Sequence, residues 1–228
     1  MHIQDGFLNN NLAGSMFAGA VCMFGYCFGK MLKTVSVVSE NLVTNHGNTP
    51  IKQNIVFLSK KSKQNFQELA LIATWIFAFQ MFNVPIQSAT SAHIIGGVFA
   101  AILAGPFAGF IIMSSVLIVQ ALFFSDGGLL ALGANIFNMA LVGSFISYYI
   151  YKNIKKTNYV LAVFTACFFS VMGASLSCLA ELAFSNTIIF SKAFKDMTTM
   201  HLIVSLLESI ITLILIKLFK NLNGDINE

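Results

Sequence analysis

Long apolar segments, separated by polar connections, run through most of the chain. A helix needs about 20 predominantly apolar residues to cross the hydrocarbon core of a bilayer. On this criterion the pattern predicts seven membrane-spanning helices, at Leu12–Met31, Leu69–Val84, Ala92–Ala104, Phe107–Phe124, Leu129–Tyr151, Tyr159–Phe184 and Leu202–Phe219. The third segment is short and only Gly105-Pro106 separates it from the fourth, so a single kinked helix over both is the alternative.

The composition supports a membrane protein. Of the 228 residues, 57% are hydrophobic and 10% are charged, whereas soluble domains carry about 25% charged residues. We therefore predict an all-α protein in which residues 1–228 form one transmembrane domain. Outside the helices, the pattern leaves a polar tail at 1–11 and one long polar loop at 32–67, where a short helix is expected over Ile51–Leu58.

The lysines orient this bundle. All 13 basic residues are lysines, and most lie in three groups, at 30–63, 152–156 and 217–220. Basic residues concentrate in cytoplasmic loops, so these groups should share one side of the membrane. An even number of crossings must then separate Lys63 from Lys152, which favours seven helices over six. The prediction places the N-terminus outside and both the C-terminus and the 32–67 loop in the cytoplasm. Lysine-rich loops beside anionic lipid account for the basic pI without nucleic-acid binding.

The sequence shows no enzyme motif. A GxxxxGK[ST] phosphate loop, an HExxH pair and a Ser/His/Asp set on one stretch are all missing. The four cysteines lack CxxC spacing and are expected to pack among apolar neighbours. Gly25-xxx-Gly29 is typical of a close helix crossing. His46 is expected to be solvated in its loop, and His201, on one helical face with Glu208, to make a structural contact between helices.

The first two residues offer an unusual set of nitrogen donors. The Met1 amine, the His2 backbone nitrogen and His2 Nδ1 can close a five-membered and a six-membered chelate ring on one divalent ion. No basic residue precedes Lys30, so no signal peptide is recognised and Met1 is expected to keep its amine. His93, on the same outer side, would supply a fourth nitrogen. Such a set suits late first-row metals better than calcium or magnesium, although a histidine at a helix end is more often structural.

Further polar residues near the outer side are candidates to support these ligands. They are Asp5, Ser91, Gln120, Asp126, Asn135 and Asn138. Two interpretations remain open for the asparagines, which lie on one helical face. They form hydrogen bonds between helices, or they belong to a shell that orients the imidazoles and the amine. Asp5 is expected to tie down the tail rather than touch the metal.

Several blocks of the sequence resemble one known family. MHIQDGFL is similar to the N-terminal MHIPDGFL of the CbiM/NikM family, SATSAHIIGG to its GGTSxHLLGG, and VQALFFSDGGLLALGANIFNM to its most recognisable block. The likeness includes HLIVSLLES and covers most of the chain. Two differences stand out: Gln4 replaces a proline of the family, and Ser88-Ala89 replaces a Gly-Gly pair.

That family comprises the substrate-capture subunits of energy-coupling factor transporters for cobalt or nickel. The resemblance implies that Met1, His2 and His93 hold the metal, with the tail folded back into the outer half of the bundle. It implies import of Co²⁺ or Ni²⁺ across the inner (plasma) membrane of a prokaryote, with cobalt for cobalamin biosynthesis as the first expectation. The transported ion is then the cargo, and no permanently bound cofactor is expected.

The resemblance also implies partners. These are a transmembrane coupling subunit, two ATP-binding subunits that hydrolyse ATP, and in some systems a small accessory membrane subunit. The chain itself would then be no enzyme. The alternative from another class is a channel or secondary carrier that moves the metal unaided. It would require polar residues along the path to the cytoplasm, and the stretch after His93, IIGGVFAAILAGPFAGFII, supplies almost none.

Overall fold

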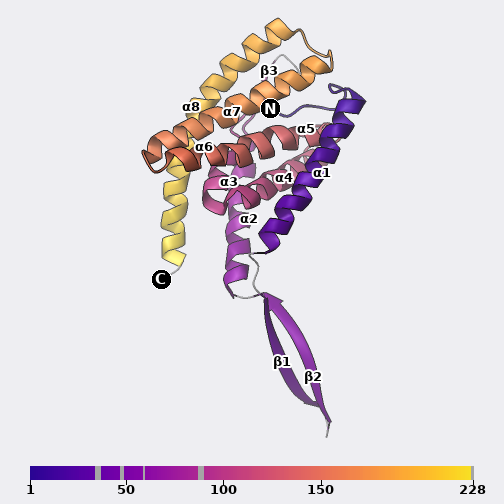
Figure 1. The fold of residues 1–228 in the computed structure, drawn as a ribbon, viewed down its shortest axis with the longest axis vertical. Coiled ribbons are helices and arrows are strands. Elements are labelled where there is room, and N and C mark those ends of the chain that lie inside the picture. Colours follow the sequence, from indigo (N-terminus) through magenta and orange to yellow (C-terminus); the bar gives the residue numbers. More distant parts are fainter. Residues whose placement is uncertain (34–36, 47–48, 59, 87–89, 227–228) are drawn as a thin grey trace.

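The computed structural model describes residues 1–33, 37–46, 49–58, 60–86 and 90–226. Most of the described chain is helical (Figure 1). In chain order the elements are α1 (Asn10–Leu32), β1 (Val37–His46), β2 (Thr49–Leu58), α2 (Lys60–Gln80), β3 (Val84–Ile86), β4 (Thr90–Ala92), α3 (Gly97–Ala104), α4 (Pro106–Phe123), α5 (Leu132–Ile136), the π-helix η1 (Phe137–Ile146), α6 (Ser147–Ile154), α7 (Tyr159–Phe184) and α8 (Phe190–Ile226).

Local signals explain where three long helices begin. The Asn9 side chain accepts a hydrogen bond from the Asn11 N–H at the start of α1, and Asn158 does the same for Leu161 in α7. Such asparagine caps satisfy backbone donors that have no partner within the helix. Pro106 opens α4 at a position where its fixed φ suits the first turn. These three helices match the predicted segments to within two residues at each end.

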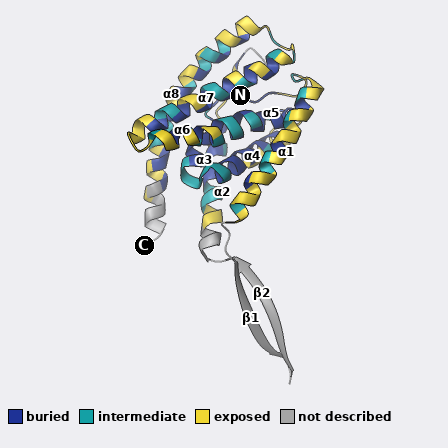
Figure 2. Cartoon of the chain, viewed as in Figure 1, coloured by how far each residue is buried: buried dark blue, intermediate teal, exposed yellow. Residues whose placement is uncertain are grey.

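The most deeply buried residues lie in the centre of the bundle, where α3 and α4 pack against each other and against η1 (Figure 2). The long helices α7 and α8 pair along one side, while α1 contacts α4 and α5 and exposes much of its surface. Small residues allow close contacts between backbones. A Cβ at Gly97 would lie 2.5 Å from the Gly143 carbonyl oxygen, which joins α3 to η1.

Four described helical segments are long and apolar enough to cross a membrane: Asn10–Leu32, Pro106–Phe123, Tyr159–Phe184 and Phe190–Phe219. The helical class is confirmed, while the count of seven crossings and the orientation stay predictions. The other three segments differ from expectation. The second begins early, at Lys60; the third holds β4 and the eight-residue α3; the fifth is divided among α5, η1 and α6. The seventh predicted helix begins at Phe190, so His201 lies inside α8 and not at its start.

The predicted polar loop contains regular structure. Strands β1 and β2 pair antiparallel from Val37↔Leu58 to His46↔Thr49, and this hairpin extends away from the helices (Figure 1). The short helix predicted over Ile51–Leu58 is therefore wrong. The stretch KQNIVF contains β-branched and aromatic residues that favour a strand once a partner is available.

Two packing predictions need correction. A Cβ at Gly25 or Gly29 would meet no atom within 4 Å outside the helix's own backbone, so the described chain has no close crossing there. The close approach of α1 occurs instead at Phe17, whose Cα would lie 2.3 Å from a Cβ at Gly133. Of the four cysteines, Cys22 is exposed, whereas the other three are buried as predicted.

Candidate metal centre

The N-terminal tail folds back into the bundle. Met1 and Ile3 have no exposed surface, and His2 is 2% exposed. The N-terminus lies near α5 and α7 (Figure 1), and Ile3 belongs to an apolar cluster with Ala134 of α5 and Leu179 of α7. Burial of a charged terminus costs free energy unless the charge is paired or hydrogen-bonded. The tail is therefore part of the interior, and its polar groups need partners there.

Asn135 of α5 holds the tail by its backbone. The Ile3 N–H donates to Asn135 Oδ1 at 2.8 Å, and Asn135 Nδ2 donates to the Ile3 carbonyl at 3.1 Å. The Gly128 N–H donates to the same carbonyl at 2.9 Å. One side-chain amide thus satisfies both backbone groups of Ile3, which places the preceding residue, His2, at a defined position.

Asp5 fastens the next part of the tail to the turn before α5. Its carboxylate accepts hydrogen bonds from the N–H groups of Leu129 at 3.1 Å, Leu130 at 2.8 Å and Ala131 at 3.3 Å. The contact leaves no room for a side chain at Gly128, where a Cβ would lie 2.1 Å from Asp5 Oδ1. This geometry agrees with the expectation that Asp5 ties down the tail.

The Met1 amine lies against strand β4, where it donates to the Ser91 carbonyl oxygen. Burial lowers the pKa of this amine from 8.0 to about 5, and the nearby Cys178 and Asp126 oppose that shift only in part. The amine is therefore neutral at neutral pH. A neutral amine keeps a lone pair, which a metal ion requires.

His2 and His93 stack on each other although they are 91 positions apart. Their ring centroids are 4.7 Å apart with 26° between the planes, and each residue is 2% exposed. On the other side, His2 Nε2 lies 3.7 Å from Asp126 Oδ2. Burial and the neighbouring amine lower the pKa of His2 well below its ordinary value, which keeps the imidazole neutral.

Gly127 closes over His2. Its φ of +90° suits glycine, and a Cβ there would lie 3.0 Å from both His2 Nδ1 and Asn135 Nδ2. The turn Asp126-Gly127-Gly128 therefore covers the tail directly. Asp126 lies against His2, Gly127 against His2 and Asn135, and Gly128 against Asp5.

The orientation of His93 leaves one ring nitrogen free. His93 Nδ1 lies 2.9 Å from the Ile94 carbonyl oxygen. A carbonyl only accepts, so Nδ1 carries the proton and Nε2 carries the lone pair. Nε2 is buried and has no hydrogen-bond partner. Histidines that bind metals commonly donate their other N–H to a backbone carbonyl in this way.

The candidate metal centre combines side-chain imidazoles with main-chain nitrogens. The described residues contain no group of three or more His, Cys, Asp and Glu side chains placed to hold a metal ion. Two imidazoles and the amine nevertheless meet in one buried place. The ring centroids of His2 and His93 are 4.7 Å apart, so the two imidazoles border the same buried space.

The other predicted supporting residues take different roles. Asn138 donates to Glu181 Oε2 at 2.8 Å, which is a contact between η1 and α7 rather than with an imidazole. The Gln120 side-chain amide is fully buried without a partner, and its backbone carbonyl accepts from the Asp126 N–H. Ser91 contributes its carbonyl, while its hydroxyl has no partner. Ser88-Ala89 lies outside the described residues.

Two residues near the centre were not proposed from the sequence as parts of the site. Glu208 of α8 accepts hydrogen bonds from the backbone of Ile95 and Gly96, and Gln80 of α2 donates to the Ile95 carbonyl. His201 Nδ1 donates to Met197 of its own helix. The predicted contact between helices thus belongs to Glu208. A carboxylate in the middle of an apolar helix was the available signal, since such residues face the bundle interior and need partners.

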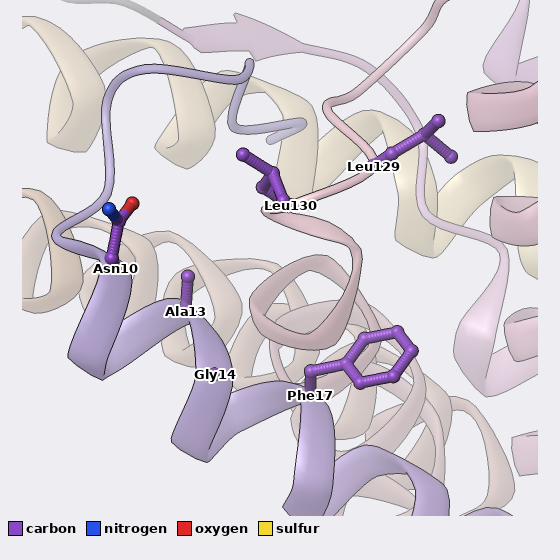
Figure 3. A pocket seen from close by; sticks show the side chains of 6 residues that line it. All are labelled: Asn10, Ala13, Gly14, Phe17, Leu129 and Leu130. Atoms are coloured by element: carbon purple, nitrogen blue, oxygen red, sulfur yellow. The ribbon is translucent and has the colours of Figure 1, made fainter.

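A surface hollow lies nearby but is chemically different. Asn10, Ala13, Gly14 and Phe17 of α1 line it together with Leu129 and Leu130, and its volume is about 360 Å³ (Figure 3). The lining is almost entirely apolar. It offers no set of nitrogen donors, so the buried histidine pair is the better candidate centre.

Comparison with known proteins assigns this chain to a family. A putative fused nickel transport protein of Archaeoglobus fulgidus is 34% identical over 93% of this chain, which spans 63% of that protein's length. A putative metal transport protein of Haloquadratum walsbyi is 32% identical over 93% of this chain and 86% of its own length. The cobalt transport protein CbiM of Thermosipho melanesiensis is 41% identical over 47% of this chain and 46% of its own length.

Solved structures agree with the sequence comparisons. A crystal structure of a transition metal transporter is 28% identical and superposes with a TM-score of 0.80, covering 98% of this chain and 94% of that one. A truncated transition metal transporter gives 0.79 at 29% identity, covering 97% and 99%. The profile of one family, CbiM, described as the cobalt uptake substrate-specific transmembrane region, matches residues 2–226. The chain therefore belongs to the CbiM family of transmembrane transport proteins.

Proposed function

We propose that this chain captures Co²⁺ or Ni²⁺ on the outer side of a prokaryotic plasma membrane, as the substrate-specific subunit of an energy-coupling factor transporter. One observation carries the proposal: the Met1 amine and the stacked rings of His2 and His93 are buried together, with the amine neutral. The family description, cobalt uptake, fits this nitrogen-rich centre.

The proposed ligands are the Met1 amine, the His2 backbone nitrogen, His2 Nδ1 and His93 Nε2. The first three form two chelate rings, and the fourth is the unpartnered ring nitrogen of His93. Binding would replace the hydrogen bond between the amine and Ser91. Asp5 and Asn135 would hold the tail in the docked position while the ion enters.

The choice between cobalt and nickel depends on the relative affinities of the site for Co²⁺ and Ni²⁺. Relatives carry both metals in their names, and four nitrogen donors favour Ni²⁺ over Co²⁺ in raw affinity. The family description, cobalt uptake, makes cobalt the first expectation, and cobalamin biosynthesis is its proposed use. Titration of the purified protein with one ion in the presence of the other would order the two affinities.

Energy coupling is proposed to come from other chains. The family is described as a substrate-specific region, which fits a subunit that captures cargo and leaves ATP hydrolysis to two ATP-binding subunits and a transmembrane coupling subunit. A small accessory membrane subunit is proposed as a further partner and would leave the ligand set unchanged. The relative from Archaeoglobus fulgidus is a longer, fused protein, of which this chain matches one part.

The channel or carrier alternative finds little support in the interior. Several buried hydroxyls lie along α7 and α8, but they are committed to backbone carbonyls: Ser170 donates to Gly143, Ser205 to Leu202 and Ser209 to Ser205. A hydroxyl that donates keeps its lone pairs, but the stretch after His93, IIGGVFAAILAGPFAGFII, supplies almost no polar side chains for a path to the cytoplasm. The interior therefore favours capture of the ion over free passage.

Extending the chain by one residue ahead of Met1 tests the chelate. The extension leaves every side chain unchanged but removes the amine from its place, so the purified protein should lose stoichiometric nickel or cobalt. His93→Ala should also abolish tight binding, because it removes one donor. A tag after Glu228 is the control and should have no effect.

Metal per protein is measured in variants of equal folded yield. If the extended protein kept stoichiometric metal, the amine would be no ligand. If His93→Ala kept the affinity of the unaltered protein in a calorimetric titration, His93 would not belong to the site.

A further inference from the structure

The backbone immediately after His93 is held from two sides. The Ile95 N–H donates to Glu208 Oε2 at 2.7 Å and the Gly96 N–H donates to Glu208 Oε1 at 3.0 Å. Gln80 Nε2 donates to the Ile95 carbonyl oxygen at 2.7 Å. The two anchors come from α8 and α2, which are far apart in the sequence. Together with the bond from His93 to the Ile94 carbonyl, they fix three consecutive residues.

This arrangement is more specific than ordinary packing. Glu208 and Gln80 have no exposed surface, and both oxygens of Glu208 are used by the same turn. A carboxyl group whose two oxygens accept from two successive backbone N–H groups fixes both the position and the orientation of that turn. Gly96 has a φ of +75°, and a Cβ there would lie 3.0 Å from Ile76 of α2. The turn therefore has little freedom to move between α2 and α8.

We propose that Glu208 and Gln80 are positioning residues for His93, which fix its turn so that the imidazole stands against His2 and the amine. The inference rests on the proposed function, since it assigns these residues to the same metal centre. Glu208 and Gln80 differ from purely structural residues because the backbone that they anchor begins at Ile95, two residues after the proposed ligand His93. A small shift of Ile95 changes the direction of the His93 ring.

Metal coordination is sensitive to such shifts. Ligand distances must lie within about 0.2 Å of their preferred values. Loss of an outer-shell partner typically costs about 10- to 100-fold in metal affinity. We expect the larger effect from Glu208, which makes two bonds, and the smaller from Gln80, which makes one.

The test compares Glu208→Gln, Gln80→Met and Ser209→Ala. Glu208→Gln keeps the side-chain shape but leaves one acceptor where there were two. Gln80→Met keeps the length and removes the donor. Ser209→Ala is the matched control, because Ser209 is buried next to Glu208, and its hydroxyl bonds Ser205 of its own helix and Cys167 of α7 rather than the turn after His93. Thermal unfolding of each detergent-solubilised protein monitors folding.

Three measurements follow: Ni²⁺ affinity by titration, the visible absorption bands of the nickel-loaded protein, and amide hydrogen exchange at residues 94–97 without metal. We expect Glu208→Gln to lower affinity by about 10-fold or more, to shift the bands and to speed exchange. Gln80→Met should act in the same direction, and Ser209→Ala should match the unaltered protein.

Unchanged affinity and unchanged bands in both Glu208→Gln and Gln80→Met would overturn the inference. If Glu208→Gln gave too little folded protein, Gln80→Met would decide alone. If the unaltered protein bound neither Ni²⁺ nor Co²⁺, the proposed function would fail instead. Exchange at residues 94–97 would still show whether the two residues hold the turn.

Discussion

At the scale of single residues, the chemistry of the centre depends on keeping nitrogens neutral. The Met1 amine has a pKa of about 5 because it is buried, whereas the amine of a free tail titrates near 8.0. Between these two values, a released tail binds a proton that a docked tail does not bind. Docking of the tail is therefore favoured as the pH rises from about 5 to 8, and it gains nothing further from this group above pH 8.

This difference gives a pH prediction. In the intact protein the amine is already neutral between pH 5 and 8, so it should add no pH dependence to nickel binding in that range. A synthetic MHIQDGF peptide should lose affinity up to tenfold per unit of pH below about 8, because its amine must release a proton before binding. Parallel calorimetric titrations of the protein and the peptide measure the two slopes. Equal slopes would mean that the tail is not docked before the metal arrives.

At the scale of elements, the tail and the turn before α5 form one unit. Asp5→Ala removes the acceptor for three backbone N–H groups, and loss of such a cap costs about 0.5–2 kcal/mol. We expect weaker nickel binding, since a released tail must be reordered before it can chelate. Asp5→Asn should recover part of the loss, because it keeps one acceptor oxygen. The exposed neighbour Gln4 provides the control, Gln4→Ala, which should bind like the unaltered protein in the same titration.

Elements also show how far the sequence predicts the structure. The bounds of α7 were predicted correctly because one apolar run begins at an asparagine cap and ends in a polar turn. The segment from Thr90 to Gly97 could not be predicted, since β4 and the turn after it are stabilised by residues distant in the chain, such as Glu208 and Gln80. Hydrophobic patterns do not record contacts of that kind, and the π-helix η1 has the same apolar pattern as an α-helix.

The candidate site, like the fold, was predicted from the sequence only in part. The donors Met1, His2 and His93 were expected from chelate chemistry and from the resemblance, and the structure places them together, although their role as ligands stays a prediction. Asn138 was grouped with Asn135 by helical spacing, but only Asn135 reaches the tail. The π-helix that begins at Phe137 separates the two positions, so α-helical spacing stops being a guide there.

At the scale of the whole molecule, capture and transport should be separable. We expect vesicles that hold this chain alone to bind ⁶³Ni or ⁵⁷Co without accumulating it, because the stretch after His93 supplies almost no polar side chains to conduct the ion. Addition of the coupling and ATP-binding subunits with ATP inside the vesicle should produce uptake. The control is the same complex with His93→Ala, which should hydrolyse ATP without uptake. Accumulation by the chain alone would favour the channel or carrier.

The long-range contacts of the tail also have a consequence for biosynthesis. Ile3 pairs with Asn135, 132 positions later, and Met1 pairs with Ser91, 90 positions later. Asn135 lies beyond the midpoint of the 228 residues, so Ile3 cannot complete its contacts until more than half of these residues have been synthesised. Burial of the tail is therefore a late step in folding, completed only after Asn135 is available to pair with Ile3.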